Sequence, residues 1–337
     1  MINMKKNSNV NLQSAKNCKN DEFYTTYECI DKELINYSGQ FFRKTVLCNC
    51  DDPFESNFCK FFIVNFNKFG LKRLICTSYK SSPIACKELP FDGNNGNQGY
   101  SFILDNVNET DIRVEEALSI INSGSLRQLN GSGDFASQEC IDYLKEADIV
   151  VTNPPFSLFR PFISLLVAYK KKFLVIGNMN AITYKEIFPL IQNNEAWLGY
   201  NNGDMAFRVP ENTEPRKTRF WIDDTGQKWR SLGNAMWLTN LDVAYRHKTM
   251  TLTTSYNPLI HRKFDNYEAI NVPKVSLIPY NYNGVMAVPL TILNKYNPDQ
   301  FEIVGEANHG SDNPYDLFKP VIDGKSIFKR ILIRVKR

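Results

Sequence analysis

The residues Asn153, Pro154, Pro155 and Phe156 combine a side-chain amide, a rigid backbone and an aromatic ring after an apolar, β-branched stretch. An amino group on an aromatic ring is a poor nucleophile because its lone pair is delocalised into the ring. The Asn153 side-chain oxygen and the Pro154 carbonyl can each accept one N–H of such a group, which favours a tetrahedral nitrogen with an exposed lone pair. Phe156 offers a face on which the ring can stack. The four residues therefore suit methyl transfer to a planar amino group.

The same residues can also form a plain strand-to-helix turn, in which Pro155 starts the helix and Phe156 packs in the core. Their position favours the chemical interpretation, because they follow a predicted central strand within an alternating α/β pattern. A stacking aromatic at this point makes sense if a base has been swung out of a duplex.

Short apolar runs alternate with helical patterns from residue 21 to about residue 195. Uninterrupted apolar strands separated by helices indicate parallel pairing with both faces covered. We therefore expect an α/β fold with a doubly wound, mostly parallel, Rossmann-like sheet. Ligands bind beyond the carboxyl ends of the strands in such a sheet, so the residues after each strand are the candidates for function. The expected strands are 44–49, 72–79, 100–105, 148–153 and 172–178, and the expected helices are 56–70, which ends at Gly70, 137–147, which Ser137 or Asp134 caps, and 158–170.

Several stretches resemble the EcoRI-type adenine-specific DNA methyltransferases, a family that depends on S-adenosylmethionine. The resemblance covers most of the chain, from about residue 20 to the end. It implies a site-specific DNA adenine-N6 methyltransferase that acts on a flipped-out adenine in double-stranded DNA. Such an enzyme modifies DNA in a restriction-modification system, with a possible cognate restriction endonuclease that forms no stable complex with it, or works as a solitary or phage methylase. The stretches are DEFYTT, VLCNCDDPFESNF, GSGDFASQECIDYLKEADIVVTNPPFSLFR, YNGVMAVPLTILNKYNPDQFEIVG and IFKRILIR.

The resemblance also assigns roles to individual residues. Asn153, Pro154 and Phe156, with Pro155 between them, would form the target-adenine site. Four groups of residues would bind the cofactor: Phe23, Tyr24 and Thr25 would close over it; Asn49, Cys50, Asp51, Asp52 and Pro53 would approach its methionine part; Thr77 and Ser78 would lie near its ribose; and Asp134 and Phe135 would bind its adenine ring.

Two departures from common methyltransferase patterns affect the cofactor site. No glycine lies between Gly39 and Gly70, where many methyltransferases have a glycine-rich turn. The second strand ends in CTSYKS, without the usual ribose-binding acid, so Thr77, Ser78 or Tyr79 would have to substitute for it through hydroxyl or backbone contacts. Asp51 and Asp52 are candidates for the cofactor's ammonium group by charge, although one of them could instead cap the next helix. Asp134 could likewise be a plain helix cap.

The chain of 337 residues, with 43% hydrophobic residues and a net charge of +4, can form one large domain with an insertion or two domains. We expect a loose arm over 1–20, the S-adenosylmethionine-binding core over 21–195, a β-rich target-recognition region over 196–275, and C-terminal strands over 276–337 that complete the core. Basic residues interleaved with Trp and Tyr between 205 and 265 suit phosphate contacts and base readout. Residues 317–337 hold seven Lys/Arg and one acid, and could simply be a solvated edge strand.

The eight cysteines include no Cys-x-x-Cys pair, and the three histidines lie far from them in sequence, so we expect no metal site. The expected location is the cytoplasm, for a prokaryotic or phage-encoded protein, because neither a signal peptide nor a membrane span is apparent. Two alternatives remain open. The chain could methylate RNA adenine or a protein glutamine amide, although glutamine-modifying relatives favour Tyr at the position of Phe156. It could also be a catalytically silent DNA-binding protein of the same fold.

Overall fold

The computed structural model describes residues 24–80, 98–109, 111–209, 211, 213–307 and 319–336. Phe23 and the expected arm over 1–20 lie outside these residues. The contacts divide the chain into two compact units. Unit 1 comprises residues 1–179 and 201–241, and unit 2 comprises residues 180–200 and 242–337.

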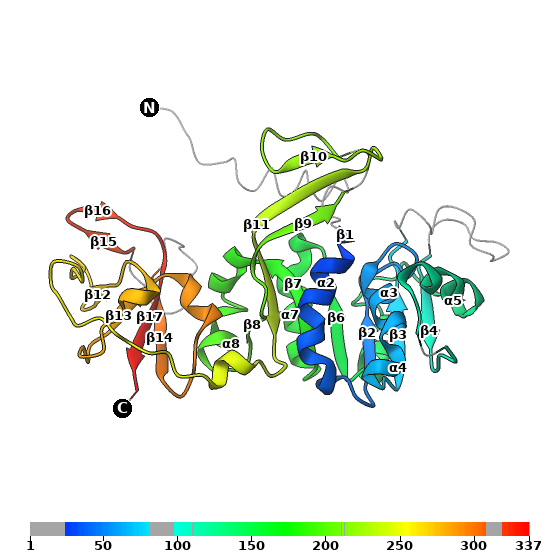
Figure 1. The fold of residues 1–337 in the computed structure, drawn as a ribbon, viewed down its shortest axis with the longest axis horizontal. Coiled ribbons are helices and arrows are strands. Elements are labelled where there is room, and N and C mark those ends of the chain that lie inside the picture. Colours follow the sequence, from blue (N-terminus) through cyan, green and yellow to red (C-terminus); the bar gives the residue numbers. More distant parts are fainter. Residues whose placement is uncertain are drawn as a thin grey trace. The chain divides into compact units, whose positions relative to one another are not determined.

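A parallel four-stranded core lies at the centre of unit 1 (Figure 1). Its neighbouring strands are β3 (Arg73–Thr77), β2 (Thr45–Cys48), β6 (Ile149–Thr152) and β7 (Lys172–Asn178), and each adjacent pair is parallel. Every residue of β2 and β6 is buried, as their uninterrupted apolar sequences predicted. The α/β fold class with a parallel central sheet is confirmed.

Antiparallel strands extend this core on both sides. β4 (Tyr100–Leu104) and β5 (Ser125–Gln128) continue the sheet beyond β3. Beyond β7 follow β11 (Lys228–Thr239), β9 (Gly203–Arg208) and β1 (Tyr24–Thr25), and β10 (Phe220–Ile222) pairs with β11. We refer to β9, β10 and β11 as the hairpin. Figure 1 shows β10 and the start of β11 projecting from the rest of unit 1.

The helices of unit 1 begin and end close to the predicted residues. Gly70 ends the segment after β2 with φ 62°, a left-handed conformation that suits glycine. Ser137, rather than Asp134, caps the helix before β6 by accepting a hydrogen bond from the Cys140 amide. The helices are α2 (Tyr27–Leu34), α3 (Asn57–Val64), α4 (Phe66–Phe69), α5 (Ala117–Ser123), α6 (Gln138–Glu146) and α7 (Phe159–Ala168), with 3-10 helices η1 (Ile35–Gln40), η2 (Val114–Glu116) and η3 (Phe156–Leu158).

Unit 2 has a sheet of its own, with strand order β12 (Ile270–Asn271), β13 (Met286–Val288), β17 (Arg330–Val335) and β14 (Phe301–Ala307). A small cluster that includes Phe264, Ala287 and Leu332 is buried there. We expected the strands of 276–337 to complete the core sheet, but the longest of them pair with one another instead. The remaining elements are η4 (Met179–Thr183), α8 (Phe188–Gln192), β8 (Trp197–Leu198), η5 (Ala244–His247), η6 (Val275–Leu277), η7 (Leu290–Asn294), β15 (Val321–Ile322) and β16 (Lys325–Ser326).

The longest helix of the described residues, α7, has ten residues, and no described helix could cross a membrane.

Candidate active site

The order of the parallel strands reverses between β2 and β6. The chain passes from β2 through α3 and α4 to β3 on one side, and from β6 through α7 to β7 on the other. At such a point the two crossovers leave a crevice at the carboxyl ends of the strands, where open α/β sheets bind ligands. The loop after β2 (residues 49–56, the cofactor loop) and the loop after β6 (residues 153–156, the NPPF loop) both start at this crevice.

Asp51 joins the two loops. Its carboxylate accepts hydrogen bonds from the Thr152 hydroxyl at 2.5 Å, from the Ser56 hydroxyl at 2.8 Å, and from the backbone N–H of Asn153. Burial raises the pKa of Asp51 to about 6, although these three donors act in the opposite direction. Ser56, and not Asp51, caps α3. Asp51 therefore fixes the distance between the loops, whichever ligand it also contacts.

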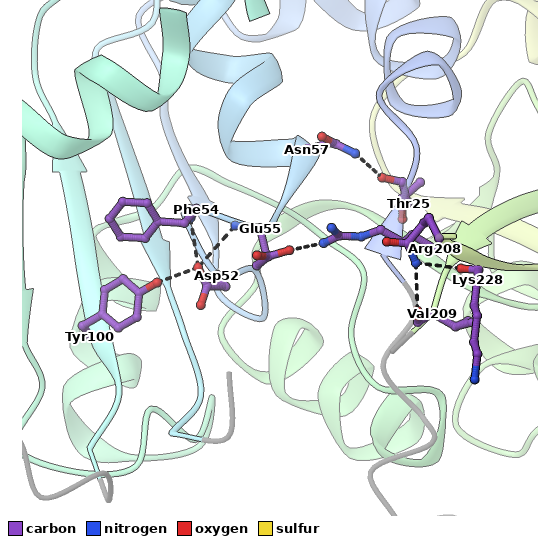
Figure 2. Close-up of polar contacts among 10 residues, drawn as sticks. Thr25, Asp52, Phe54, Glu55, Asn57, Tyr100, Arg208, Val209 and Lys228 are labelled. Atoms are coloured by element: carbon purple, nitrogen blue, oxygen red, sulfur yellow. Dashed lines mark hydrogen bonds and ion pairs between the residues drawn. The ribbon is translucent and has the colours of Figure 1, made fainter. Parts of the chain in front are cut away.

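Asp52 stabilises the turn of the cofactor loop. Its Oδ1 accepts hydrogen bonds from the Tyr100 hydroxyl at 2.5 Å and from the Phe54 backbone N–H at 2.9 Å. Burial raises the pKa of Asp52. Tyr100 starts β4, which lies beyond β3, whereas the hairpin lies beyond β7. The bond therefore ties the cofactor loop to the part of the sheet that is farther from the hairpin; Figure 2 shows Tyr100 beside Asp52.

In the NPPF loop, the side chain of Asn153 is held through its nitrogen. Its Nδ2 donates to Thr25 Oγ1 at 3.3 Å, which turns the amide oxygen away from Thr25. Pro154 is buried, whereas Phe156 is half-buried at the start of η3 and packs edge-to-face on Phe207, with 6.4 Å between ring centroids. In a plain strand-to-helix turn Phe156 would be a buried core residue, whereas here it is only half-buried.

The expected adenine pocket lies where the loop before α6 meets the end of β3. Gly133 has φ +76°, and a Cβ at this position would collide with the Ser78 carbonyl oxygen. Asp134 accepts a hydrogen bond from the Ala136 backbone N–H at 2.8 Å and remains exposed. The half-buried ring of Phe135 packs edge-to-face on Phe162, with 5.1 Å between centroids. The carboxylate of Asp134 and the ring of Phe135, which are adjacent in sequence, therefore follow the glycine that lies against the end of β3.

The remaining predicted residues differ in their surroundings. Asn49 is 1% exposed, and neither its Nδ2 nor its Oδ1 has a hydrogen-bond partner among the described residues. Such a pair of buried polar atoms is costly unless a ligand satisfies them, so Asn49 fits a polar ligand. Thr77 is fully buried, and the Ser78 hydroxyl accepts from the Tyr100 backbone N–H at 3.1 Å. Cys50 is half-buried and Pro53 is buried within the cofactor loop.

Ser56, Tyr100 and Glu55 were not singled out from the sequence, and Arg208 was counted only among the basic residues between 205 and 265. Ser56 could have been found, because a serine before a helical pattern is a common cap. Tyr100, Glu55 and Arg208 gave no such signal, because each contacts a partner that is distant in sequence. Arg208 forms an ion pair with Glu55 and stacks over the Tyr24 ring, with 4.8 Å from its Cζ to the ring centroid.

Comparisons with known proteins identify the family of the chain. The sequence model of the family described as adenine-specific methyltransferase EcoRI matches residues 11–336. The type II methyltransferase M.EcoRI of Escherichia coli is 46% identical over 336 residues, which cover 97% of this chain and 96% of the relative. The type II methyltransferase M.MgeORF184P of Mycoplasma genitalium is 40% identical over 86% of this chain and 84% of the relative. The type II methyltransferase M.MpnI of Mycoplasma pneumoniae is 37% identical over 86% of this chain and 83% of the relative.

No solved structure matches the chain. The family match nevertheless spans nearly the whole sequence, including the cofactor loop, the NPPF loop and the hairpin. The chain belongs to the EcoRI family of adenine-specific methyltransferases.

Proposed function

We propose that the chain transfers a methyl group from S-adenosylmethionine to the N6 amino group of an adenine in double-stranded DNA. The observation that carries the proposal is the Asp51–Thr152 bond, which joins the cofactor loop to the strand end that bears Asn153. A methyl donor bound at the first loop would lie beside an amine bound at the second. The near full-length match to type II DNA methyltransferases supports DNA as the substrate.

The residues on the donor side suit S-adenosylmethionine. Asp51 and Asp52 offer carboxylates to an ammonium group, and the buried amide of Asn49 lacks a partner among the described residues. Asp134 can accept a hydrogen bond from an adenine amino group, and Phe135 can pack on the ring. When bound, S-adenosylmethionine supplies a methyl group on a positively charged sulfur: as the amino nitrogen bonds to the methyl carbon, the carbon–sulfur bond breaks to leave S-adenosylhomocysteine, and the nitrogen releases one proton.

On the acceptor side, the protein orients the amine and does not react with it. The Asn153 Oδ1 and the Pro154 carbonyl would each accept one amino hydrogen, so that the nitrogen lone pair points out of the ring plane towards the donor. Phe156 would stack on the base after the base has left the duplex. The hairpin, with its basic and aromatic residues, would hold the surrounding DNA.

The family resemblance extends the proposal to biology. The enzyme would work in the cytoplasm as the modification part of a restriction-modification system, or as a solitary or phage methylase. A cognate endonuclease, if the system has one, would read the same site without a stable complex.

Purified protein should transfer labelled methyl groups from S-adenosylmethionine to mixed-sequence duplex DNA. RNA and protein acceptors in parallel reactions distinguish the alternative substrates. Intact binding of S-adenosylmethionine without transfer to any DNA would contradict the proposal. Sequencing of methylated DNA from cells that express the chain would then identify the recognition sequence.

Substitution of the amide tests the chemical role. Asn153→Ala should abolish turnover and leave S-adenosylmethionine binding largely intact, because the side chain acts on the acceptor. Asn108→Ala, which removes an exposed asparagine far along the chain from both loops, should behave as the wild type. Turnover of Asn153→Ala near the wild-type rate would show that the assigned role is wrong.

A further inference from the structure

The end of β9 contacts both loops of the candidate site. Its last two residues, Phe207 and Arg208, point to opposite faces of the strand, as neighbours in a strand do. Phe207 is fully buried and packs on Phe156 of the NPPF loop. Arg208 reaches the other way and forms an ion pair with Glu55 of the cofactor loop (Figure 2). One strand end therefore supports the loops proposed for both substrates.

The Arg208–Glu55 pair is partly shielded from water, with 34% and 24% of the two side chains exposed. The guanidinium also stacks over Tyr24, so it is fixed on two sides. Lys60 lies close enough to Glu55 and Arg208 for both charges to affect its pKa, which burial lowers. Glu55 therefore has two cations nearby, and Arg208 is the one with which it forms the ion pair.

The position of Glu55 matters because its backbone belongs to the turn that Asp52 closes. Asp52 Oδ1 accepts from the N–H of Phe54 and, at 3.4 Å, from the N–H of Glu55. A shift of Glu55 would alter this turn and hence the carboxylate of Asp52. Arg208 therefore acts on the cofactor loop through Glu55.

β1 provides a second route from the hairpin. Tyr24 and Thr25 pair with Arg208 and Phe207. The Thr25 carbonyl accepts from Asn57 Nδ2 at 2.7 Å, at the start of α3, and its hydroxyl accepts from Asn153. Figure 2 shows Thr25 between Asn57 and Arg208.

β9, which bears Arg208, is joined to β11 within the hairpin. Val209 donates from its backbone N–H to the Lys228 carbonyl at 3.0 Å, and β9 pairs with β11 from Trp229 onwards. A displacement of the hairpin by bound DNA would therefore move Arg208 as well.

We propose that Arg208 is a positioning residue that transmits the position of the hairpin to the cofactor loop through Glu55. This inference rests on the proposed function, in which the hairpin holds DNA and the loop holds S-adenosylmethionine. It assigns to Arg208 a role in cofactor affinity, although the residue lies on the strand expected to serve DNA recognition.

Calorimetry with S-adenosylhomocysteine tests the inference on four full-length variants: Glu55→Gln, Arg208→Gln, the double variant, and Arg208→Lys. Each neutral single variant should weaken binding about tenfold, the change that 1.4 kcal/mol produces. The affinity of the double variant for S-adenosylhomocysteine should be no lower than that of the single variant with the lower affinity, because both substitutions remove the same interaction. Arg208→Lys keeps the charge and should recover most of the affinity.

Asp204→Asn provides the matched control. Asp204 lies on the same strand and pairs with Arg219 at 2.8 Å, but this pair is exposed and contacts neither loop. The variant should bind S-adenosylhomocysteine as the wild type does. Melting temperatures and binding to a mixed-sequence duplex are measured on every variant.

Three results would overturn the inference: wild-type affinity for S-adenosylhomocysteine in Glu55→Gln and Arg208→Gln, effects that multiply in the double variant, or a loss confined to melting temperature. Loss of DNA affinity in Arg208→Gln alone would identify a direct phosphate contact and overturn it too. The proposed function fails separately, if the wild type binds S-adenosylhomocysteine but methylates no DNA.

Discussion

Phe156 is held on one side and is not fully covered, which is the arrangement that a stacking residue needs. Phe207 packs against the ring in a T-shaped contact, and the half-buried side chain leaves part of Phe156 accessible. Phe156→Ala should therefore lower kcat/KM for DNA by an amount that corresponds to roughly 1–3 kcal/mol, the usual value of stacking on one base. Phe156→Tyr should retain most of the activity, and binding of S-adenosylhomocysteine should be unchanged in both variants. A loss of cofactor binding that parallels the loss of activity would contradict the stacking role.

Asp51 gives the stability of the protein a specific dependence on pH. Burial raises its pKa to about 6, above the value of about 3.9 for an unfolded chain. The folded state therefore holds this proton more tightly, so the stability it contributes is complete below about pH 4 and is lost as the pH rises to about 6. Asp51→Asn has no such group. Relative to Asp51→Asn, the wild type should lose about 2–3 kcal/mol of unfolding free energy between these pH values.

Chemical denaturation of both proteins from pH 4 to pH 7 measures this difference. Asp142→Asn serves as a control of opposite sign, because a hydrogen bond from Lys145 lowers the pKa of the exposed Asp142. Its contribution to stability is present at neutral pH and lost on acidification. A pH-independent difference between the wild type and Asp51→Asn would contradict the raised pKa.

At the scale of elements, the loop before α6 depends on a single glycine. Gly133 has a positive φ and lies against the Ser78 carbonyl, so Gly133→Ala must strain the backbone and push this loop away from the end of β3. We expect a loss of about 1–3 kcal/mol in stability and a weaker affinity for S-adenosylhomocysteine. Gly131→Ala is the control in the same loop, because a Cβ there meets nothing within 4 Å. Equal effects of the two substitutions would show that the contact with Ser78 does not matter.

The sequence predicted the elements whose signals are local. Apolar runs identified β2, β3, β6 and β7, and the cap residues Gly70 and Ser137 ended or began helices as expected. Because parallel strands align their carboxyl ends, the meeting of the cofactor loop and the NPPF loop followed from these elements alone.

Contacts between distant strands had no comparable signal. β1 is two residues long and pairs with β9 about 180 residues later. Tyr100 reaches Asp52 from an antiparallel strand, a direction that the apolar pattern of β4 does not specify. These contacts depend on which edges meet, and this is why the bonds of Thr25 and Arg208 were not predicted.

At the scale of the whole molecule, the strand pattern did not reveal which sheet each strand joins. β13 is as apolar as a core strand, and β14 and β17 contain apolar stretches beside two charged residues each, yet the three strands pair with one another in unit 2. An apolar strand requires a covered face, which either unit can provide. The expected role of 196–275 in target recognition stays a prediction, to be tested by function.

The two basic regions of the chain allow such a test through the salt dependence of DNA binding. Arg216 and Lys217, exposed residues just before β10, should contact phosphates if the hairpin holds DNA. The slope of log K against log salt is negative, and each lost phosphate contact lowers its magnitude by about 0.9, so Arg216→Gln/Lys217→Gln should make it less steep by nearly two. The exposed Lys319 and Lys325 of unit 2 supply the control. Lys319→Gln/Lys325→Gln also reduces the net charge by two, from +4 to +2, but should leave the slope unchanged.

Anisotropy of a labelled duplex between about 50 and 200 mM salt measures both slopes. The opposite result would place the DNA on the C-terminal basic region instead of the hairpin.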